Sequence, residues 1–223
     1  MQTQPTDSTC GPTCLHAVYS FFGDHVSLQR IIDEVPALPE GGTVAVRLGN
    51  HALTRGYRCT LNTYNLQMFD PTWFKDPRID IGERLRAQAK AKRSAKLRLV
   101  TQSYLTFLEL GGVLRFTELN GNLIRTYLKR EIPILTGLSA TYLYACARET
   151  KRDYDDTRGE PMGHFVVLAG YDPSAHKILV ADPLRDNPRY GVKHYAVGSE
   201  RLLGAILLGI ITYDANLLII EPS

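Results

Sequence analysis

The order of regular segments along the chain is the feature that most limits its possible folds. Apolar residues recur at helical spacing over 10–22, 27–35 and about 43–55, and this spacing predicts three helices in the first part of the chain. After one strand at 57–63 and a helix at 119–129, strand-like segments dominate, at 133–138, 165–170, 177–181, 194–197 and 217–221, with one further helix at 199–208. Helices followed by strands predict an α+β fold with a largely antiparallel sheet.

The composition changes between residues 66 and 98. Within 84–98 (RLRAQAKAKRSAKLR), 7 basic residues stand among alanines, a composition that favours a solvated helix with few core positions. We expect a single domain over 1–223, in which 66–98 form a basic helical insertion or lid. The basic stretch could bind an acidic protein, a nucleic acid or an anionic membrane. It lacks aromatic residues that would stack on bases, so we favour the interpretation that it is a solvated helix face.

Charge and cysteine content exclude several classes of protein. A net charge of +3 is too small to indicate nucleic-acid binding, and no apolar run approaches the length of a membrane span. The first residues do not resemble a secretory signal, and 4 cysteines do not make a disulfide framework in a chain of this length. We expect a cytoplasmic protein that uses neither a cofactor nor a metal.

One cysteine stands at the expected start of the first helix, in the segment QPTDSTCGP at residues 4–12. A nucleophilic cysteine must be a thiolate, and a helix N-terminus stabilises that charge through unpaired backbone N–H groups and the helix dipole. Thr9 is placed to cap this helix, and Pro12 fits its first turn. Gly11 leaves room beside the Cys10 sulfur for a substrate carbonyl, which makes it a candidate substrate-binding residue.

Gln4 lies six residues before Cys10 and can fold back toward it. Its side-chain amide and the Cys10 backbone N–H would then form an oxyanion hole. The alternative is that Cys10 is a packing residue, because cysteine is among the most buried residue types. Cys14, one helical turn later, is interpreted as a core residue on the same grounds.

Two of the expected strands carry the other candidates. The first begins with Gly163 and His164, and Asp182 follows the second (KILVA) 18 residues after His164. In an antiparallel pair the start of one strand lies beside the end of the next, so Asp182 can accept a hydrogen bond from His164. That bond fixes the imidazole tautomer and stabilises the imidazolium formed when His164 takes the Cys10 proton. Taken alone, His164 is explained as a structural histidine at a strand start, and Asp182 as a turn residue before a proline. The occurrence of Cys10, His164 and Asp182 in one consistent order along the chain favours a catalytic role for all three.

These motifs resemble the papain-like cysteine peptidase superfamily and, within it, the bacteriocin-processing (double-glycine leader) peptidases. That family has a Gln, a Cys-Gly six residues later, a Gly-His strand and an Asp-Pro, which match Gln4, Cys10-Gly11, Gly163-His164 and Asp182-Pro183. The resemblance covers about 1–60 and 120–222. It implies a papain-like fold with the nucleophile helix packed on an antiparallel sheet, and catalytic roles for Cys10, His164, Asp182 and Gln4. It omits the basic segment, and the Cys-to-His spacing is longer than in transporter-linked peptidases.

A weaker resemblance is to phytochelatin synthases, which share the Gln-to-Cys-Gly spacing and a Gly-His-Phe strand. The expected activity is therefore hydrolysis of a peptide or amide bond in a peptide or protein substrate, through a thioester intermediate. The resemblance suggests that the role of this activity is to process a peptide precursor. An acyltransferase with the same three residues, or a non-catalytic peptide-binding module, remains as an alternative. The family fold places the loop after 133–138 near the site, so Tyr142 and Tyr144, together with Gly163, are candidate substrate-binding residues.

Overall fold

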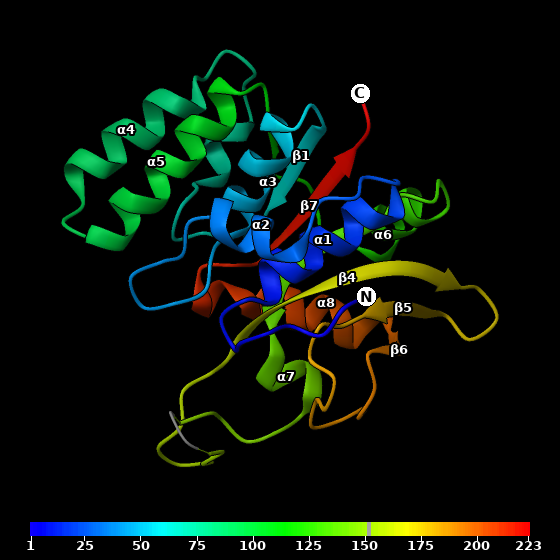
Figure 1. The fold of residues 1–223 in the computed structure, drawn as a ribbon. Coiled ribbons are helices and arrows are strands. Elements are labelled where there is room, and N and C mark those ends of the chain that lie inside the picture. The colour runs from blue at the N-terminus through cyan, green and yellow to red at the C-terminus, as the bar shows by residue number, and fades with distance from the viewer. Residues whose placement is uncertain (151–152) are drawn as a thin grey trace.

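The structure is a computed structural model that describes residues 1–150 and 153–223. Its centre is a seven-stranded sheet in the order β2-β1-β7-β3-β4-β5-β6, drawn in Figure 1. The strands are β1 (Arg58–Thr63), β2 (Val113–Arg115), β3 (Ile134–Ser139), β4 (Gly163–Asp172), β5 (Lys177–Ala181), β6 (His194–Gly198) and β7 (Asn216–Glu221). All neighbouring pairs are antiparallel except β1 and β2. The predicted α+β class with a largely antiparallel sheet is confirmed.

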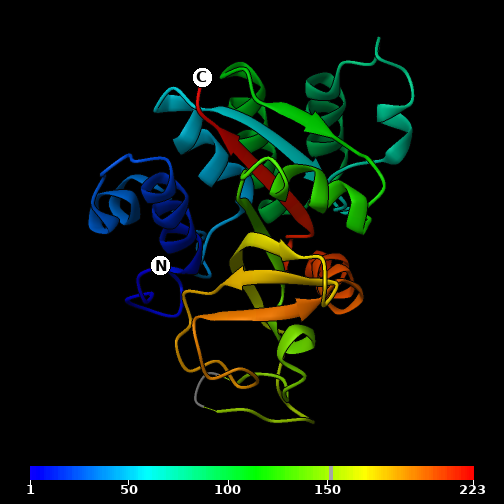
Figure 2. The same cartoon turned by 90° about the vertical axis from the view of Figure 1, so that its right-hand side faces the viewer.

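Both faces of the sheet are apolar, because side chains alternate along each strand. In β7, Leu218 and Ile220 belong to one buried cluster, whereas Leu217 and Ile219 belong to the other. Figure 2 shows α1 and α8 on opposite sides of the twisted sheet. The first face is covered by α1 (Cys10–Phe21), α2 (Leu28–Glu34), α3 (Ala45–Thr54), α4 (Ile81–Ala91) and α5 (Ala95–Glu109). The second is covered by α6 (Gly121–Leu128), α7 (Ala140–Tyr144) and α8 (Ser199–Leu208).

Helix α1 begins at Cys10, as the sequence predicts. Thr9 is the N-cap residue, but its side chain does not cap the helix; its Oγ1 donates instead to the Thr6 carbonyl at 2.8 Å. Pro12 lies in the first turn, where its missing N–H costs no helical hydrogen bond. After the helix, Gly23 adopts a φ of +78°, a conformation that suits glycine and turns the chain away. Thr9 takes part in the start of α1 only through its backbone carbonyl, which accepts from the Thr13 N–H at 3.0 Å.

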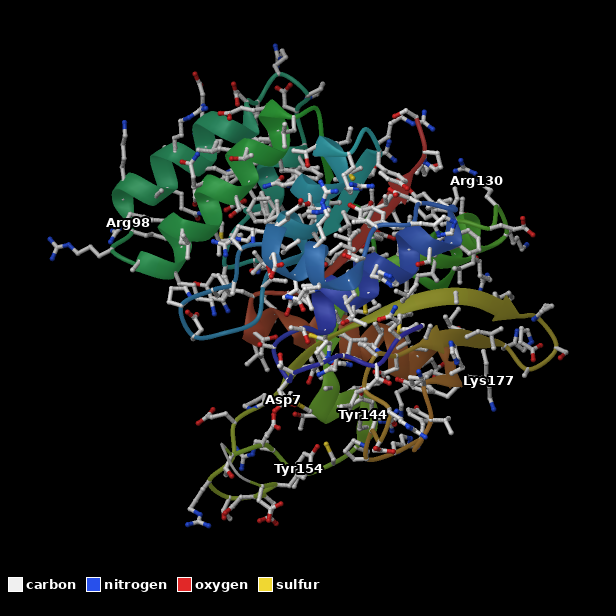
Figure 3. The ribbon with its side chains drawn as sticks, viewed as in Figure 1. Asp7, Arg98, Arg130, Tyr144, Tyr154 and Lys177 are labelled. Carbon is white, nitrogen blue, oxygen red and sulfur yellow. The ribbon has the colours of Figure 1, made fainter. Side chains whose placement is uncertain are left out.

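The expectation of a single solvated helix at 84–98 is wrong. The chain forms two helices there, α4 and α5, and Ser94 caps the second by accepting from the Leu97 N–H. Leu85 and Leu97 are buried in the same cluster as α1, while Arg98 projects outward from α5 (Figure 3). The apolar positions of this segment are hard to recognise in the sequence, because only about one residue per helical turn faces the core and basic residues occupy most of the others.

A few smaller features complete the fold. The short elements β2 and α7, and the 3₁₀ turns η1 (Pro71–Phe74) and η2 (Gly209–Thr212), are not evident from the sequence. Helix α8 begins at Ser199, with Gly198 as its N-cap residue. Across the described residues, no helix is both long enough and apolar enough to cross a membrane.

Candidate active site

The N-terminus of α1 lies over the start of β4. The Cys14 thiol donates to the Phe165 carbonyl at 3.2 Å, which fixes the helix one turn beyond Cys10. A Cβ on Gly11 would come within 2.8 Å of Thr43 Cγ2 and 3.3 Å of the Phe165 ring. The close approach that this glycine permits brings Cys10 next to the first residues of β4.

His164 and Asp182 meet as the strand order predicts. Strands β4 and β5 pair with Val167 opposite Ala181, so the start of β4 lies beside the end of β5. His164 Nε2 donates to Asp182 Oδ1 at 2.9 Å, and both side chains are buried, with 5% and 0% of their areas exposed. The register of the hairpin, together with the position of each residue at a strand end, produces this contact.

Asp182 is surrounded by donors. Besides His164, its carboxylate accepts hydrogen bonds from the Tyr144 hydroxyl at 2.7 Å, the Tyr195 hydroxyl at 2.6 Å and the Leu184 N–H at 2.9 Å. Burial alone would raise the pKa of Asp182, but the bonds from His164 and the two tyrosines hold it below its usual value. Asp182 is therefore an ionised, wholly buried acceptor for His164.

Cys10 lines the same cleft as His164 and interacts with it. Because Nε2 is bonded to Asp182, Nδ1 is the nitrogen left for the sulfur. Burial lowers the pKa of His164, but hydrogen bonds to Asp182 and Cys10 and the charges of both outweigh burial and raise it to about 10. This arrangement can hold an imidazolium beside a thiolate and pass a proton between the imidazole and a group bound at the sulfur.

A cleft of about 580 Å³ opens onto these residues. Cys10, His164, Gly163 and Gln4 all line it. Its walls come from the N-terminal residues, the loop before α3, the start of β4 with the chain before it, and more distant residues that include Lys96 of α5, Leu184 and Asp214. Figure 3 shows Asp7 and Tyr154, which also line the cleft, in the same lower region of the molecule although far apart in sequence.

Gln4 lines the cleft together with Cys10. Its backbone N–H donates to the Pro183 carbonyl at 3.1 Å, which ties it to the residue after Asp182. Its side-chain Nε2 donates to the Thr6 carbonyl at 3.1 Å, and that bond leaves one amide hydrogen for another acceptor. The Cys10 N–H lies in the first turn of α1, where helical N–H groups have no partner within the helix.

Three sequence-based assignments need correction. Gly11 does not line the cleft; it is buried, and its small size serves the packing of α1 on Thr43 and Phe165. Tyr142 also lies outside the cleft lining, because α7 turns its ring onto Gly204 of α8 with the Arg201 guanidinium 5.4 Å from the ring centroid. Tyr144 is buried and bonds to Asp182, so it faces the carboxylate rather than a substrate.

Sequence reasoning missed the part that Tyr144 and Tyr195 play at Asp182. A tyrosine on α7 and another on β6 carry no local signal that they converge on one carboxylate. Asp214 was missed as well: it lines the cleft, 5% exposed, and burial raises its pKa to about 8. Within the described part of the chain, no cluster of His, Cys, Asp and Glu is arranged to hold a metal ion.

The chain matches one family model and is similar to several solved structures. The family model described as "Peptidase_C39 like family" matches residues 1–200. The chain is similar to the peptidase domain of Streptococcus ComA, a bi-functional ABC transporter of a quorum-sensing pathway, at 13% identity and a TM-score of 0.47 over 100% of this chain and 97% of that one. It is also similar to a C39-like peptidase described from Bacillus anthracis, at 15% identity and a TM-score of 0.48 over 100% and 95% of the two chains.

A third similar structure is a double-glycine motif protease from an AMS/PCAT transporter, solved with its leader peptide. The identity is 12% and the TM-score 0.46, over 99% of this chain and 89% of that one. Among curated proteins, none matches the sequence.

Proposed function

The chain belongs to the Peptidase_C39 like family, and from that premise we propose that it is a cysteine peptidase with Cys10 as nucleophile, His164 as its base and Asp182 orienting His164. Family membership supports a peptide bond as the target. It also supports the resemblance to the double-glycine peptidases that the motifs of the sequence predict. The processing of a peptide precursor is the role we propose for this activity.

The reaction follows from the positions of the three side chains. His164 holds the proton of Cys10 on Nδ1, and the Cys10 sulfur attacks the peptide carbonyl to form a C–S bond. The negative charge that develops on the carbonyl oxygen is stabilised by the Cys10 N–H and the free amide hydrogen of Gln4. The imidazolium then gives its proton to the departing amine as the C–N bond breaks, which leaves a thioester. Water, deprotonated by His164, cleaves the thioester and regenerates the Cys10 thiol.

The observation that carries this proposal is the convergence of His164, Asp182 and Cys10 at one cleft. His164 Nε2 is 2.9 Å from Asp182 Oδ1, His164 and Cys10 both line the cleft, and the interaction with Cys10 helps to raise the pKa of His164. Cys14 offers no rival nucleophile, because it is fully buried and burial raises the pKa of its thiol well above the usual value.

The test combines a labelling experiment with a peptide digest. We expect iodoacetamide at pH 6 to alkylate Cys10 much faster than Cys146. Cys146 is the control, because it is a half-buried cysteine outside the cleft and burial raises the pKa of its thiol. Cleavage of a random peptide library, read by mass spectrometry, should fall by about 10³-fold or more in Cys10→Ala and in His164→Ala. Cys146→Ala should cleave like the unchanged protein.

Two results would reject the proposal. One is a folded Cys10→Ala protein that still cleaves the library at the original rate. The other is alkylation of Cys10 no faster than that of Cys146. Including an added amine such as glycinamide in the digest distinguishes hydrolysis from acyl transfer, because transfer would give products extended by the amine.

A further inference from the structure

A second cavity lies between α3 and α5. Its volume is about 530 Å³. Along α3 it is lined by Arg47, Asn50, His51 and Thr54, which share one face because they are three or four residues apart. Leu99 and Ser103 of α5, and Leu110 at the C-cap of that helix, also line it. No lining residue is shared with the catalytic cleft, so the two are separate sites.

Arg47 is the unusual member of this lining. Only 8% of it is exposed, although arginine is almost never fully buried unless it is paired. Its Nε donates to Ser103 Oγ at 3.1 Å, and its Nη1 donates to the carbonyls of Pro36 and Ala37 at 3.0 and 2.9 Å. In the part of the chain that the structure describes, no carboxylate lies within ion-pair distance of this guanidinium.

The remaining nitrogen of Arg47, Nη2, is therefore the group that a ligand can use. Within the described residues no hydrogen bond from Nη2 is found. Two carbonyl groups and a hydroxyl do not neutralise a positive charge, and a buried charge without a counter-ion is destabilising. An anion in the cavity would supply the missing counter-charge through a charge-assisted hydrogen bond.

The other polar groups of the cavity narrow the choice of anion. Glu34, which also lines the cavity, is bonded to Arg30 at 2.7 Å and to His51 Nε2 at 3.0 Å. Its charge is therefore partnered by these two residues, but it disfavours a ligand that carries more than one negative charge. The rest of the lining includes Pro36, Leu99 and Leu110. A single available guanidinium nitrogen and an apolar wall suit a monoanion with an apolar body better than a multiply charged phosphate.

We propose that this cavity binds a small organic carboxylate, whose anionic group pairs with Arg47 and whose apolar body lies against Pro36, Leu99 and Leu110. The site is independent of the proposed peptidase reaction. Its ligand does not need to be a substrate, and its occupancy can be measured without any assay of activity.

The test uses two probes of the same shape and different charge, 4-phenylbutyrate and 4-phenylbutyramide, titrated into the full chain and followed by calorimetry. We expect saturable binding of the carboxylate with a Kd of about 1 mM or tighter, and binding of the neutral amide at least about tenfold weaker, because only the carboxylate pairs with Arg47. In Arg47→Met the two probes should bind equally.

Arg47→Met also removes the donor to two carbonyls, so a second variant that keeps these bonds separates loss of binding from loss of folding. Thr106→Phe fills the cavity from α5 and leaves every hydrogen bond of Arg47 in place, and it should abolish binding of 4-phenylbutyrate. The proposal is overturned if the amide binds the unchanged protein as tightly as the carboxylate. It is overturned equally if neither probe saturates, or if Thr106→Phe binds 4-phenylbutyrate unchanged.

Discussion

Asp182 shows how one buried carboxylate can be kept ionised. Taking a carboxylate out of water is costly unless hydrogen bonds replace the lost hydration. Here four donors do so: an imidazole, two phenols and one backbone N–H. Both tyrosines donate to Oδ2, while His164 and the Leu184 N–H share Oδ1. The phenols thus fix the carboxylate plane from the side opposite His164, which makes them positioning residues.

The hydrogen bond from the Tyr144 hydroxyl to Asp182 predicts the effect of Tyr144→Phe. The change removes one hydrogen bond to the charged form of Asp182, so the pKa of Asp182 should rise. Because the ionised carboxylate is what orients His164, the acidic limb of the pH–rate profile should move to higher pH, and kcat/KM at neutral pH should fall about tenfold, as expected for a bond worth about 1–2 kcal/mol. Tyr195→Phe should behave in the same way.

Tyr190→Phe is the matched control, since Tyr190 stacks on Tyr195 but no hydrogen bond from its hydroxyl to Asp182 is found in the described part of the chain. A Tyr144→Phe profile with an unmoved acidic limb would mean that the phenol does not support the carboxylate.

At the scale of elements, the α4–α5 hairpin is part of the main core despite its basic surface. Leu85 of α4 is fully buried, and α5 contributes Leu97, Val100 and Tyr104 to the same cluster. Lys96 of α5 forms an ion pair with Glu40 at 2.8 Å, and both residues line the cleft at Cys10. Figure 1 shows the two helices side by side at the end of the molecule opposite β5 and β6. The hairpin therefore stabilises the first face of the sheet and forms part of the cleft wall.

Leu85→Ala tests this role of the hairpin. Truncating a fully buried leucine should lower the free energy of unfolding by about 2–5 kcal/mol, measured by urea denaturation. Arg84→Ala, at the exposed neighbouring position, should change it by about 0.5 kcal/mol or less. A Leu85→Ala protein as stable as the Arg84→Ala protein would show that α4 is an appendage and not part of the core.

At the scale of the whole molecule, stability should depend on pH through Asp214. Burial raises its pKa to about 8, whereas an aspartate in the unfolded chain has a pKa of about 3.9. Between these values the folded protein keeps a proton that the unfolded chain has lost. The free energy of unfolding therefore decreases, as far as Asp214 is concerned, from about pH 4 to about pH 8, and the loss is complete above that range.

Asp214→Asn should remove this pH dependence, because the amide stays neutral in both states. We expect the substitution to stabilise the protein at pH 8.5 relative to its effect at pH 4, by an amount on the order of a few kcal/mol, measured by urea denaturation at both pH values. Asp186→Asn, at an exposed position, should leave the pH dependence unchanged. Equal effects of Asp214→Asn at pH 4 and pH 8.5 would contradict the assignment.

Much of this protein was determined by local sequence. Apolar spacing predicted most helices and strands, and a hairpin turn between two strands was enough to bring His164 to Asp182, because strand pairing follows from residues close together in the chain. The start of α1 at Cys10 was likewise predicted, although the Thr9 side chain does not cap the helix. The sequence also suggested Tyr142 and Gly11 as substrate contacts, but which residues face a cleft depends on the elements packed around them.

Only the tertiary structure decided the long-range contacts. Tyr144 reaches Asp182 from 38 residues away, and Arg47 bonds to Ser103 across 56 residues. The basic segment became two core helices because buried leucines outweighed a polar composition. Such contacts depend on how elements of different origin pack against one another, and no local pattern encodes that. The sequence thus specified the elements and the hydrogen-bonded pair of His164 and Asp182, whereas packing specified the surroundings of Asp182 and the cavity at Arg47.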